Sequence, residues 1–242
     1  MGDNVRLDKY LSSQLNVSRN DAKKLLRGGS VTVNGTVTKK GDVSVKPYED
    51  TVAVSGHTLE YKKYIYIMQH KPKGVVSASV SPSDVTVIDI LPEELRRSGL
   101  FPAGRLDKDT TGFVLITDDG EFAHNILSPS HHVEKTYLAE TGEILTDDDI
   151  KRFLDGMKVG EDVFRPAGIK FMEKHGDNYV YEVKICEGRY HQIRRMFASC
   201  GKPLLELSRI KIGELSLSED LLPGQSREIS PDELKKIREK SL

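Results

Sequence analysis

The chain of 242 residues carries a formal net charge of −1, and 37% of its residues are hydrophobic and 30% charged. This length and composition are typical of a globular protein with a sizeable core, which excludes a disordered or fibrous chain. No apolar run approaches the roughly 18 residues of a membrane helix, and the start MGDNVRLDKY lacks the apolar segment of a signal peptide, so we expect a cytoplasmic protein without a membrane partner.

Positive charge is concentrated at the start of the chain. Residues 1–63 contain 11 Lys and Arg against 7 Asp and Glu, a balance of +4. The remaining residues contain 25 against 30, a balance of −5, and the two balances add up to −1. A basic head on a mildly acidic body predicts a small module that binds a polyanion.

The basic head has the pattern of two short helices followed by a β-hairpin. Apolar residues from Val5 to Leu11 recur at helical spacing. Ser18 is a favourable N-cap residue for a second helix over residues 19–27, which a Gly-Gly pair ends. In VTVNGTV, residues 31–37, Asn-Gly lies between β-formers and predicts a tight hairpin turn.

The second of these helices carries a basic face, because Arg19, Lys23 and Arg27 are spaced i, i+4, i+8. Such charges often only solvate an exposed surface. The segments RLDKYL and SRNDAKKLLRGGSVTVNG, however, resemble the S4 RNA-binding domain, and the resemblance covers residues 1–60. It implies contacts to RNA phosphates, largely by shape. The residues that it assigns to RNA binding are Arg6, Arg19, Lys23, Lys24 and Arg27.

Residues 61–242 are expected to form a second, larger domain, which follows the polar linker SGHTLEYKK at residues 55–63. The strands that the pattern predicts cover residues 64–70, 112–117, 135–140, 179–185 and 204–215. The predicted helices cover residues 87–98, 120–127, 146–156 and 190–201. This irregular alternation favours an α+β fold on a mixed, largely antiparallel sheet over a doubly wound parallel one.

Several common kinds of site are excluded in this domain. The sequence has no Gly-rich phosphate loop and no GxSxG nucleophile elbow. His131 and His132 are adjacent, so on a strand they face opposite sides and do not share a metal ion. Cys186 and Cys200 lack metal-ligand spacing and are expected to be reduced thiols. We therefore expect no metal.

Two charged clusters remain as candidates for chemistry. In GRLDKDTTG, Arg105 and Lys108 flank Asp107, and cations favour the charged carboxylate, which can act as a nucleophile or a base. Taken alone, these charges together with Asp109 are more typical of a surface salt-bridge cluster on a turn than of a site. The second cluster, EGRYHQIRRMF at residues 187–197, combines arginines with aromatic residues at the start of a helix, which suits the binding of phosphate or carboxylate. Asp118 and Asp119, which precede Gly120, are typical of a turn and a helix cap instead.

Three segments together resemble the motifs of the RsuA-like pseudouridine synthases, a family that modifies ribosomal RNA: GRLDKDTTGFVLITDDG, SPSHHVEKTYLAE and EGRYHQIRRMFASCG. With the N-terminal module, the resemblance extends over nearly the whole chain, and it is greatest to members that act on small-subunit RNA. It implies an isomerase that cleaves the bond from uracil N1 to ribose C1′, rotates the base and rejoins it through C5. Because this reaction involves no net redox change, no cofactor is expected.

The resemblance also implies roles for individual residues. Asp107 matches the essential aspartate, which attacks C1′ or assists a glycal route. Tyr137 matches the tyrosine that stacks on the target base and acts in proton transfer from C5, and Arg194 matches the basic residue that pairs with the aspartate. Arg105 is expected to replace the flipped uridine in the RNA stack. Further RNA contacts are assigned to Arg189, His191 and Gln192.

The expected partner is ribosomal RNA, from the small subunit or its assembly particle, and we expect the protein to be a monomer. One alternative is a large-subunit synthase of the same family. Another is an RNA-binding assembly factor without activity, although a chain that had lost its activity would be free to replace Asp107. An unrelated hydrolase that uses Asp107 would need a residue to position water, and the sequence indicates none.

Overall fold

The computed structural model describes residues 4–128 and 133–238. The chain divides into two compact units. The first comprises Met1–Ile65 with Arg96–Gly99, and the second comprises Tyr66–Leu95 with Leu100–Leu242. The first stretch of the first unit thus ends a few residues after position 60, and a second stretch of the same unit begins at residue 96. The expected domain boundary between residues 60 and 61 therefore stays a prediction.

The first unit contains two helices and short strands around one apolar core. Its helices are α1 (Leu7–Gln14) and α2 (Arg19–Arg27). Its strands are β1 (Val5–Arg6), β2 (Val31–Val33), β3 (Thr36–Val37), β4 (Ser44–Val45), β5 (Val52–Val54) and β6 (His57–Thr58). Strand β1 pairs with β4, and the other four form a sheet in the order β3-β2-β5-β6. The inner faces of both helices and of the strands supply the core of this unit.

Local sequence signals set the elements of this unit. Ser18 caps α2 by accepting a hydrogen bond from the Asp21 amide at 3.1 Å, as expected. Asn34 and Gly35 both have positive φ, 51° and 79°, which is the conformation that the hairpin turn between β2 and β3 requires. The first helix begins two residues later than the apolar pattern predicts, because Val5 pairs with Val45 in a strand instead.

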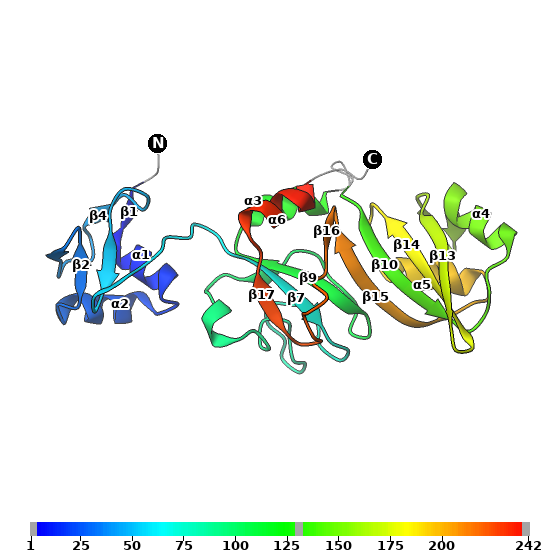
Figure 1. The fold of residues 1–242 in the computed structure, drawn as a ribbon, viewed down its shortest axis with the longest axis horizontal. Helices are drawn as coiled ribbons and strands as arrows, with labels where there is room; N and C mark the ends of the chain where they lie inside the picture. The colour runs from blue at the N-terminus through cyan, green and yellow to red at the C-terminus, as the bar shows by residue number, and fades with distance from the viewer. Residues whose placement is uncertain (1–3, 129–132, 239–242) are drawn as a thin grey trace. The chain divides into compact units, whose positions relative to one another are not determined.

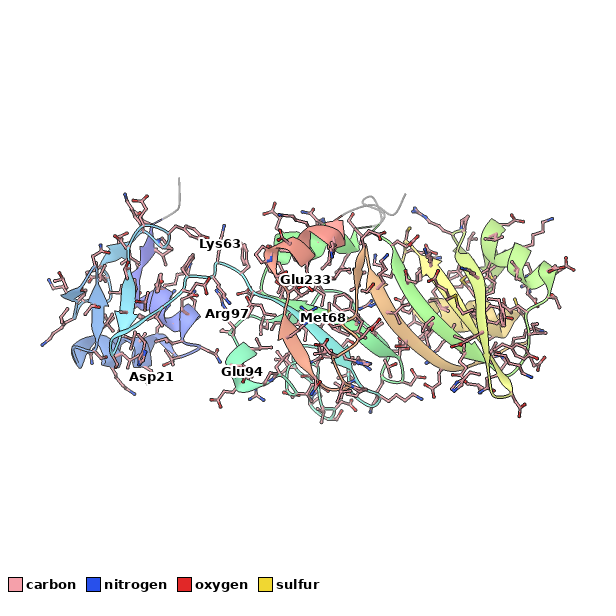
Figure 2. All side chains as sticks on the ribbon, in the orientation of Figure 1. Asp21, Lys63, Met68, Glu94, Arg97 and Glu233 are labelled. Atoms are coloured by element: carbon pink, nitrogen blue, oxygen red, sulfur yellow. The ribbon has the colours of Figure 1, made fainter. Side chains whose placement is uncertain are left out.

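A short later segment belongs to this unit. The Arg97 guanidinium donates to the carbonyl oxygens of Lys62 and Lys63 at 2.8 and 3.0 Å, and Figure 2 labels Arg97 and Lys63 next to one another. The polar linker at residues 55–63 is therefore tied to residues 96–99 by an arginine that the linker's own sequence does not reveal.

The second unit is built on a nine-stranded sheet, counted over the described residues. Its path runs β13-β14-β10-β15-β9-β7-β17, with β16 paired to β15 and β8 paired to β9. The strands are β7 (Tyr66–Lys71), β8 (Phe101–Pro102), β9 (Thr111–Thr117), β10 (Lys135–Thr141), β13 (Gly168–His175), β14 (Asn178–Ile185), β15 (Leu204–Ile212), β16 (Leu215–Ser216) and β17 (Ser226–Glu228). Within this sheet only β9 and β15 pair in parallel, so the mixed, largely antiparallel sheet is confirmed.

Helices cover the second unit in two places. Figure 1 shows α3 (Gly120–Leu127) and α6 (Pro231–Arg238) side by side, and both contribute to one buried cluster with β7 and β9. Helices α4 (Asp147–Asp155) and α5 (Gln192–Ser199) meet through Phe153 and Phe197, whose ring centroids are 5.0 Å apart. A hairpin of β11 (Met157–Val159) and β12 (Asp162–Phe164) lies next to α5.

One predicted helix is wrong. Residues 87–98 contain only a short 3₁₀ turn, η1 (Glu93–Leu95). Pro92 has no amide hydrogen and disfavours helical geometry at Leu91, so the apolar spacing across it does not produce a helix. The cap at Asp119 is confirmed, since its side chain accepts from the Phe122 amide at 3.0 Å. No helix of the described residues is long and apolar enough to cross a membrane.

Candidate active site

Asp107 opens a tight turn between β8 and β9. The Thr110 amide donates to the Asp107 carbonyl at 3.1 Å, so residues 107–110 form a hydrogen-bonded β-turn. The Gly74 amide donates to the carbonyl of Lys108 at 2.9 Å. The turn is therefore fixed both internally and to the segment that follows β7.

A buried lysine holds the same turn from within the protein. The ammonium of Lys71, at the end of β7, donates to the carbonyls of Pro72, Lys108 and Thr110 at 3.1, 3.1 and 2.7 Å. Burial lowers the pKa of Lys71 to about 8, while the charges of the two aspartates of the turn oppose the shift. One cation thus satisfies three backbone acceptors, two of them in the turn that carries Asp107.

The close approach of β9 to β15 explains why a glycine follows the turn. The parallel strands share only two register positions, Ser208 with Thr111 and Arg209 with Gly112. Gly112 has a φ of +99°, and a Cβ atom there would lie 2.2 Å from the Arg209 carbonyl oxygen. A side chain at position 112 would force the strands apart.

A cleft of about 810 Å³ is lined by residues next to these paired positions, among them Thr110 and Leu207. Its lining residues belong to the segment after β7, to the Asp107 turn, to β10 through Tyr137, and to the end of β14. Further lining residues belong to the segment that leads into α5 and, separately, to β15. Tyr137 is 7% exposed, so its ring forms part of the wall. The charged Lys, Arg and Asp side chains of the lining are Arg105, Lys108, Arg189, Arg194 and Asp107. Cations therefore surround a single carboxylate among the described lining residues, which suits a polyanionic substrate.

His191 reaches Asp107 from the other side of the cleft. Its Nε2 lies 3.4 Å from Asp107 Oδ1. The residue precedes α5 and has left-handed backbone geometry, with φ 50° and ψ 29°, which is uncommon for a residue with a side chain. The ring of Tyr190 stacks on the imidazole, with centroids 3.9 Å apart and 15° between the planes. The sequence predicts RNA binding for His191, whereas the structure places its imidazole beside Asp107.

The expected pairing of Arg194 with Asp107 is not found. Arg194 Nη2 lies 3.0 Å from Asp109 Oδ2 and 3.4 Å from Thr110 Oγ1. His191 lies next to Asp107, and the Arg194 guanidinium meets the other end of the same turn. Arg194 Nε is buried and has no hydrogen-bond partner among the described residues. Arg194 therefore lies in the site but binds the turn, not the expected aspartate.

Other residues of the third motif hold the loop before α5. Gln192 is 3% exposed, donates to Glu187 Oε1 at 2.6 Å, and accepts from the Arg189 amide at 3.2 Å. Its amide thus makes hydrogen bonds within the protein, and the RNA contact that we expected of Gln192 stays a prediction. Arg189 lines the cleft and also pairs with Asp162 at 3.1 Å.

A second, smaller hollow of about 300 Å³ lies on the first unit. Its lining residues are Arg6, Lys23, Arg27, Lys39, Gly41 and Asp42. Three of the residues assigned to RNA binding thus meet at one place, together with Lys39, which the sequence analysis did not select. Arg19 does not line the hollow, and Lys24 pairs with Asp21 at 2.8 Å instead.

The remaining candidates do not form a site. Among the described residues, no group of three or more His, Cys, Asp or Glu side chains is arranged to hold a metal ion. Cys186 and Cys200 are free thiols, and burial raises the pKa of both. His131 and His132 lie outside the described residues.

Two functional contacts were missed by sequence reasoning. Lys71 was not selected, because the strand predicted at residues 64–70 stops one residue before it, whereas β7 extends to Lys71 and buries its side chain. The contact between His191 and Asp107 joins positions far apart in the chain, and no local pattern indicates it.

Comparison with known proteins links both units to described families. A family model described as RNA pseudouridylate synthase matches residues 65–199, and one described as S4 domain matches residues 5–49. Ribosomal small subunit pseudouridine synthase A of Yersinia pestis is 40% identical over 236 residues, covering 96% of this chain and 98% of the relative. The Escherichia coli protein of the same name is 39% identical, covering 96% of this chain and 100% of the relative.

Two further relatives extend this similarity. An RNA pseudouridine synthase of Bacillus subtilis, described as uncharacterized, is 37% identical and covers 97% of this chain and 99% of its own length. A crystal structure of a pseudouridylate synthase superimposes with a TM-score of 0.66 at 34% identity, covering 96% of this chain and 99% of that one. The similarity therefore spans both units, including the cleft around Asp107.

Proposed function

Since this chain belongs to the RNA pseudouridylate synthase family, we propose that it converts one uridine of small-subunit ribosomal RNA to pseudouridine, with Asp107 as the catalytic carboxylate. The observation that carries the assignment is the position of Asp107. It is the one carboxylate among the described residues that line the cleft, with Tyr137 in the wall and His191 beside it.

The proposed reaction is balanced without a cofactor. Asp107 attacks ribose C1′ as the bond to uracil N1 breaks, which leaves an ester and a uracil anion. The base rotates, its C5 forms the new bond to C1′ and displaces Asp107, C5 loses its proton and N1 gains one. In the alternative glycal route, Asp107 takes the C2′ proton and the sugar eliminates the base; C5 of the rotated base then adds to C1′, Asp107 returns the proton to C2′, C5 loses its proton and N1 gains one. Both routes need the same carboxylate.

The other residues of the cleft have supporting roles in this proposal. A uridine in folded RNA leaves its stack before C1′ can be reached, at a cost of a few kcal/mol. Tyr137 stacks on the extruded base and takes part in removing the C5 proton. Arg105, which is exposed at the cleft, takes the place of the flipped base. Arg194 stabilises the turn through Asp109.

The choice of small-subunit RNA is supported by the named relatives from Yersinia pestis and Escherichia coli. The alternative within the family is a uridine of large-subunit RNA. A non-catalytic assembly factor is disfavoured, because the turn, the cleft and Asp107 are all in place. Pseudouridine mapping in ribosomal RNA from cells with and without the gene distinguishes these three functions. A small-subunit synthase predicts loss of a pseudouridine from small-subunit RNA, and a large-subunit synthase predicts loss of one from large-subunit RNA. A non-catalytic assembly factor predicts no loss.

Asp107→Asn tests the catalytic carboxylate, and Asp109→Asn is its matched control in the same turn. We expect Asp107→Asn to abolish pseudouridine formation while RNA affinity stays nearly unchanged. Asp109→Asn removes only a partner of Arg194 and should retain most activity. Full turnover by Asp107→Asn would contradict the assignment. Tyr137→Phe separates the proton-transfer role from stacking, because the ring stays and the hydroxyl is removed.

We also propose that the S4 domain, residues 1–60, provides much of the RNA affinity through the hollow around Lys23 and Arg27. Removing these residues should weaken RNA binding and reduce its dependence on salt, because fewer phosphates are neutralised. Equal binding and modification by the shortened chain would contradict this part of the proposal. We propose further that the protein acts as a monomer in the cytoplasm.

A further inference from the structure

Tyr190 is a large aromatic side chain at the cleft with an exposed fraction of 77%. One face of its ring is covered by the imidazole of His191, 3.9 Å away between centroids. Because the side chain is so exposed and the imidazole covers one face of the ring, the other face is open to solvent. Tyr137, by contrast, is 7% exposed and belongs to the cleft wall.

The position of this ring links it to the reacting group. His191, on which Tyr190 stacks, lies 3.4 Å from the Asp107 carboxylate. Tyr190 therefore covers one face of the imidazole whose Nε2 atom meets Asp107, and its own open face lies on the side away from that imidazole. A planar group bound there would lie next to the reacting nucleotide and outside the space that the target base occupies.

The backbone at His191 fixes this arrangement. Its left-handed geometry is costly for a residue with a side chain and persists where surrounding contacts hold it. The Arg189 amide donates to the buried Gln192 side chain, which anchors the loop on both sides of the Tyr190–His191 stack. The aromatic pair is thus presented by a fixed loop, as a binding platform requires.

The charges around Tyr190 select the kind of molecule that binds it. Arg105, Lys108 and Arg189 line the same cleft, so a ligand with phosphates on either side of a planar ring is favoured. Every nucleobase has a face that stacks on an aromatic ring regardless of its sequence. A strand of RNA supplies both features at once.

We propose that the open face of Tyr190 stacks on the nucleobase that neighbours the modified uridine in the RNA, and so holds the strand while the uridine occupies the cleft. This inference rests on the proposed function and adds a second base-binding position to it. Tyr137 receives the uridine and Tyr190 receives its neighbour. The stacking requires an aromatic ring at position 190 but not its hydroxyl group.

The test compares Tyr190→Leu and Tyr190→Phe with the wild-type enzyme. The substrate is an unmodified transcript of small-subunit ribosomal RNA labelled with tritium at uracil C5, used bare and after assembly with small-subunit proteins. Tritium release gives kcat and KM. We expect Tyr190→Leu to raise KM about tenfold with kcat nearly unchanged, which corresponds to about 1.4 kcal/mol. Tyr190→Phe should match the wild type.

Phe171→Leu is the matched control, because Phe171 is an exposed ring on β13 that does not line the cleft. It should leave both constants unchanged. Unchanged KM in Tyr190→Leu would overturn the proposal, and so would a fall in kcat alone, which would show that Tyr190 acts only by positioning His191. If the wild-type enzyme releases no tritium from either substrate, the proposed function fails as well.

Discussion

The imidazole Nε2 of His191 lies 3.4 Å from Oδ1 of Asp107, across the cleft between two distant segments of the chain. The arginine expected at this position, Arg194, is paired with Asp109 instead. The group that borders the Asp107 carboxylate is therefore an imidazole, in place of the expected guanidinium. Its stacked neighbour Tyr190 and its left-handed backbone both restrict where the ring can lie.

Replacing His191 tests whether this contact supports catalysis. In His191→Gln the amide nitrogen takes the place of Nε2, so we expect most turnover to remain. Asn tolerates the left-handed backbone, but its shorter side chain does not reach Asp107. His191→Asn should therefore lower kcat about tenfold through loss of the 3.4 Å contact. Equal turnover in both variants, measured with RNA in excess, would show that the contact has no catalytic role.

The two buried lysines among the described residues of the second unit should respond differently to removal of their charge. Lys71 donates to three carbonyls, whereas Lys135 makes one long contact, 3.4 Å, to the Ile126 carbonyl. Lys71→Met leaves buried acceptors without donors and should lower the free energy of unfolding by about 3 kcal/mol. Lys135→Met removes a buried charge next to Arg209 and should be neutral or stabilising. Urea unfolding at pH 7 measures both.

The pH dependence of Lys135→Met gives an independent check. Burial lowers the pKa of Lys135 to about 8, below its ordinary value of 10.5. Between these two pH values the unfolded chain binds more protons than the folded one, so the wild-type protein gains stability from this group as the pH rises. The advantage of Lys135→Met over the wild type should therefore shrink between pH 8 and 10.5. A constant difference would contradict the lowered pKa.

Gly112→Ala tests the close approach of β9 and β15, with Gly176→Ala as its control. Both glycines have positive φ, but a Cβ at position 112 would lie 2.2 Å from a carbonyl oxygen and one at position 176 would meet nothing within 4 Å. We expect Gly176→Ala to cost about 1 kcal/mol of stability for its backbone alone. Gly112→Ala should cost about 3 kcal/mol or more and reduce turnover, because the strands that border the cleft must shift.

The ion pair between Arg227 and Glu233 should make the docking of α6 sensitive to acid. Their Nη2 and Oε1 atoms are 2.7 Å apart, and the arginine lowers the pKa of Glu233 to about 2 from 4.5. The contribution of this ion pair to the free energy of unfolding is complete above pH 4.5 and is lost as the pH falls towards 2. Glu233→Gln should be less stable than the wild type at pH 7, and the difference should vanish near pH 2. An equal difference at both pH values, measured by urea unfolding, would contradict the pairing.

Elements with local signals could be predicted from the sequence. The helix Arg19–Arg27 follows from its Ser18 cap and its Gly-Gly end, and the hairpin after it follows from Asn34-Gly35. The strand after the Asp107 turn follows from its unbroken apolar run. The apolar spacing across Pro92 predicted a helix that does not form, because proline has no amide hydrogen to donate within a helix.

The sequence by itself determined the family, the kind of fold and the position of Asp107, because short motifs record which residues follow one another along a turn, a strand or a helix. Only the tertiary structure decided what surrounds that carboxylate: His191 beside it, Arg194 at the other end of the turn, and Lys71 within the protein beneath its backbone. These contacts join three separate segments, and they depend on strand register and on side-chain reach of a few ångströms. Neither quantity is contained in the spacing of residues along one segment.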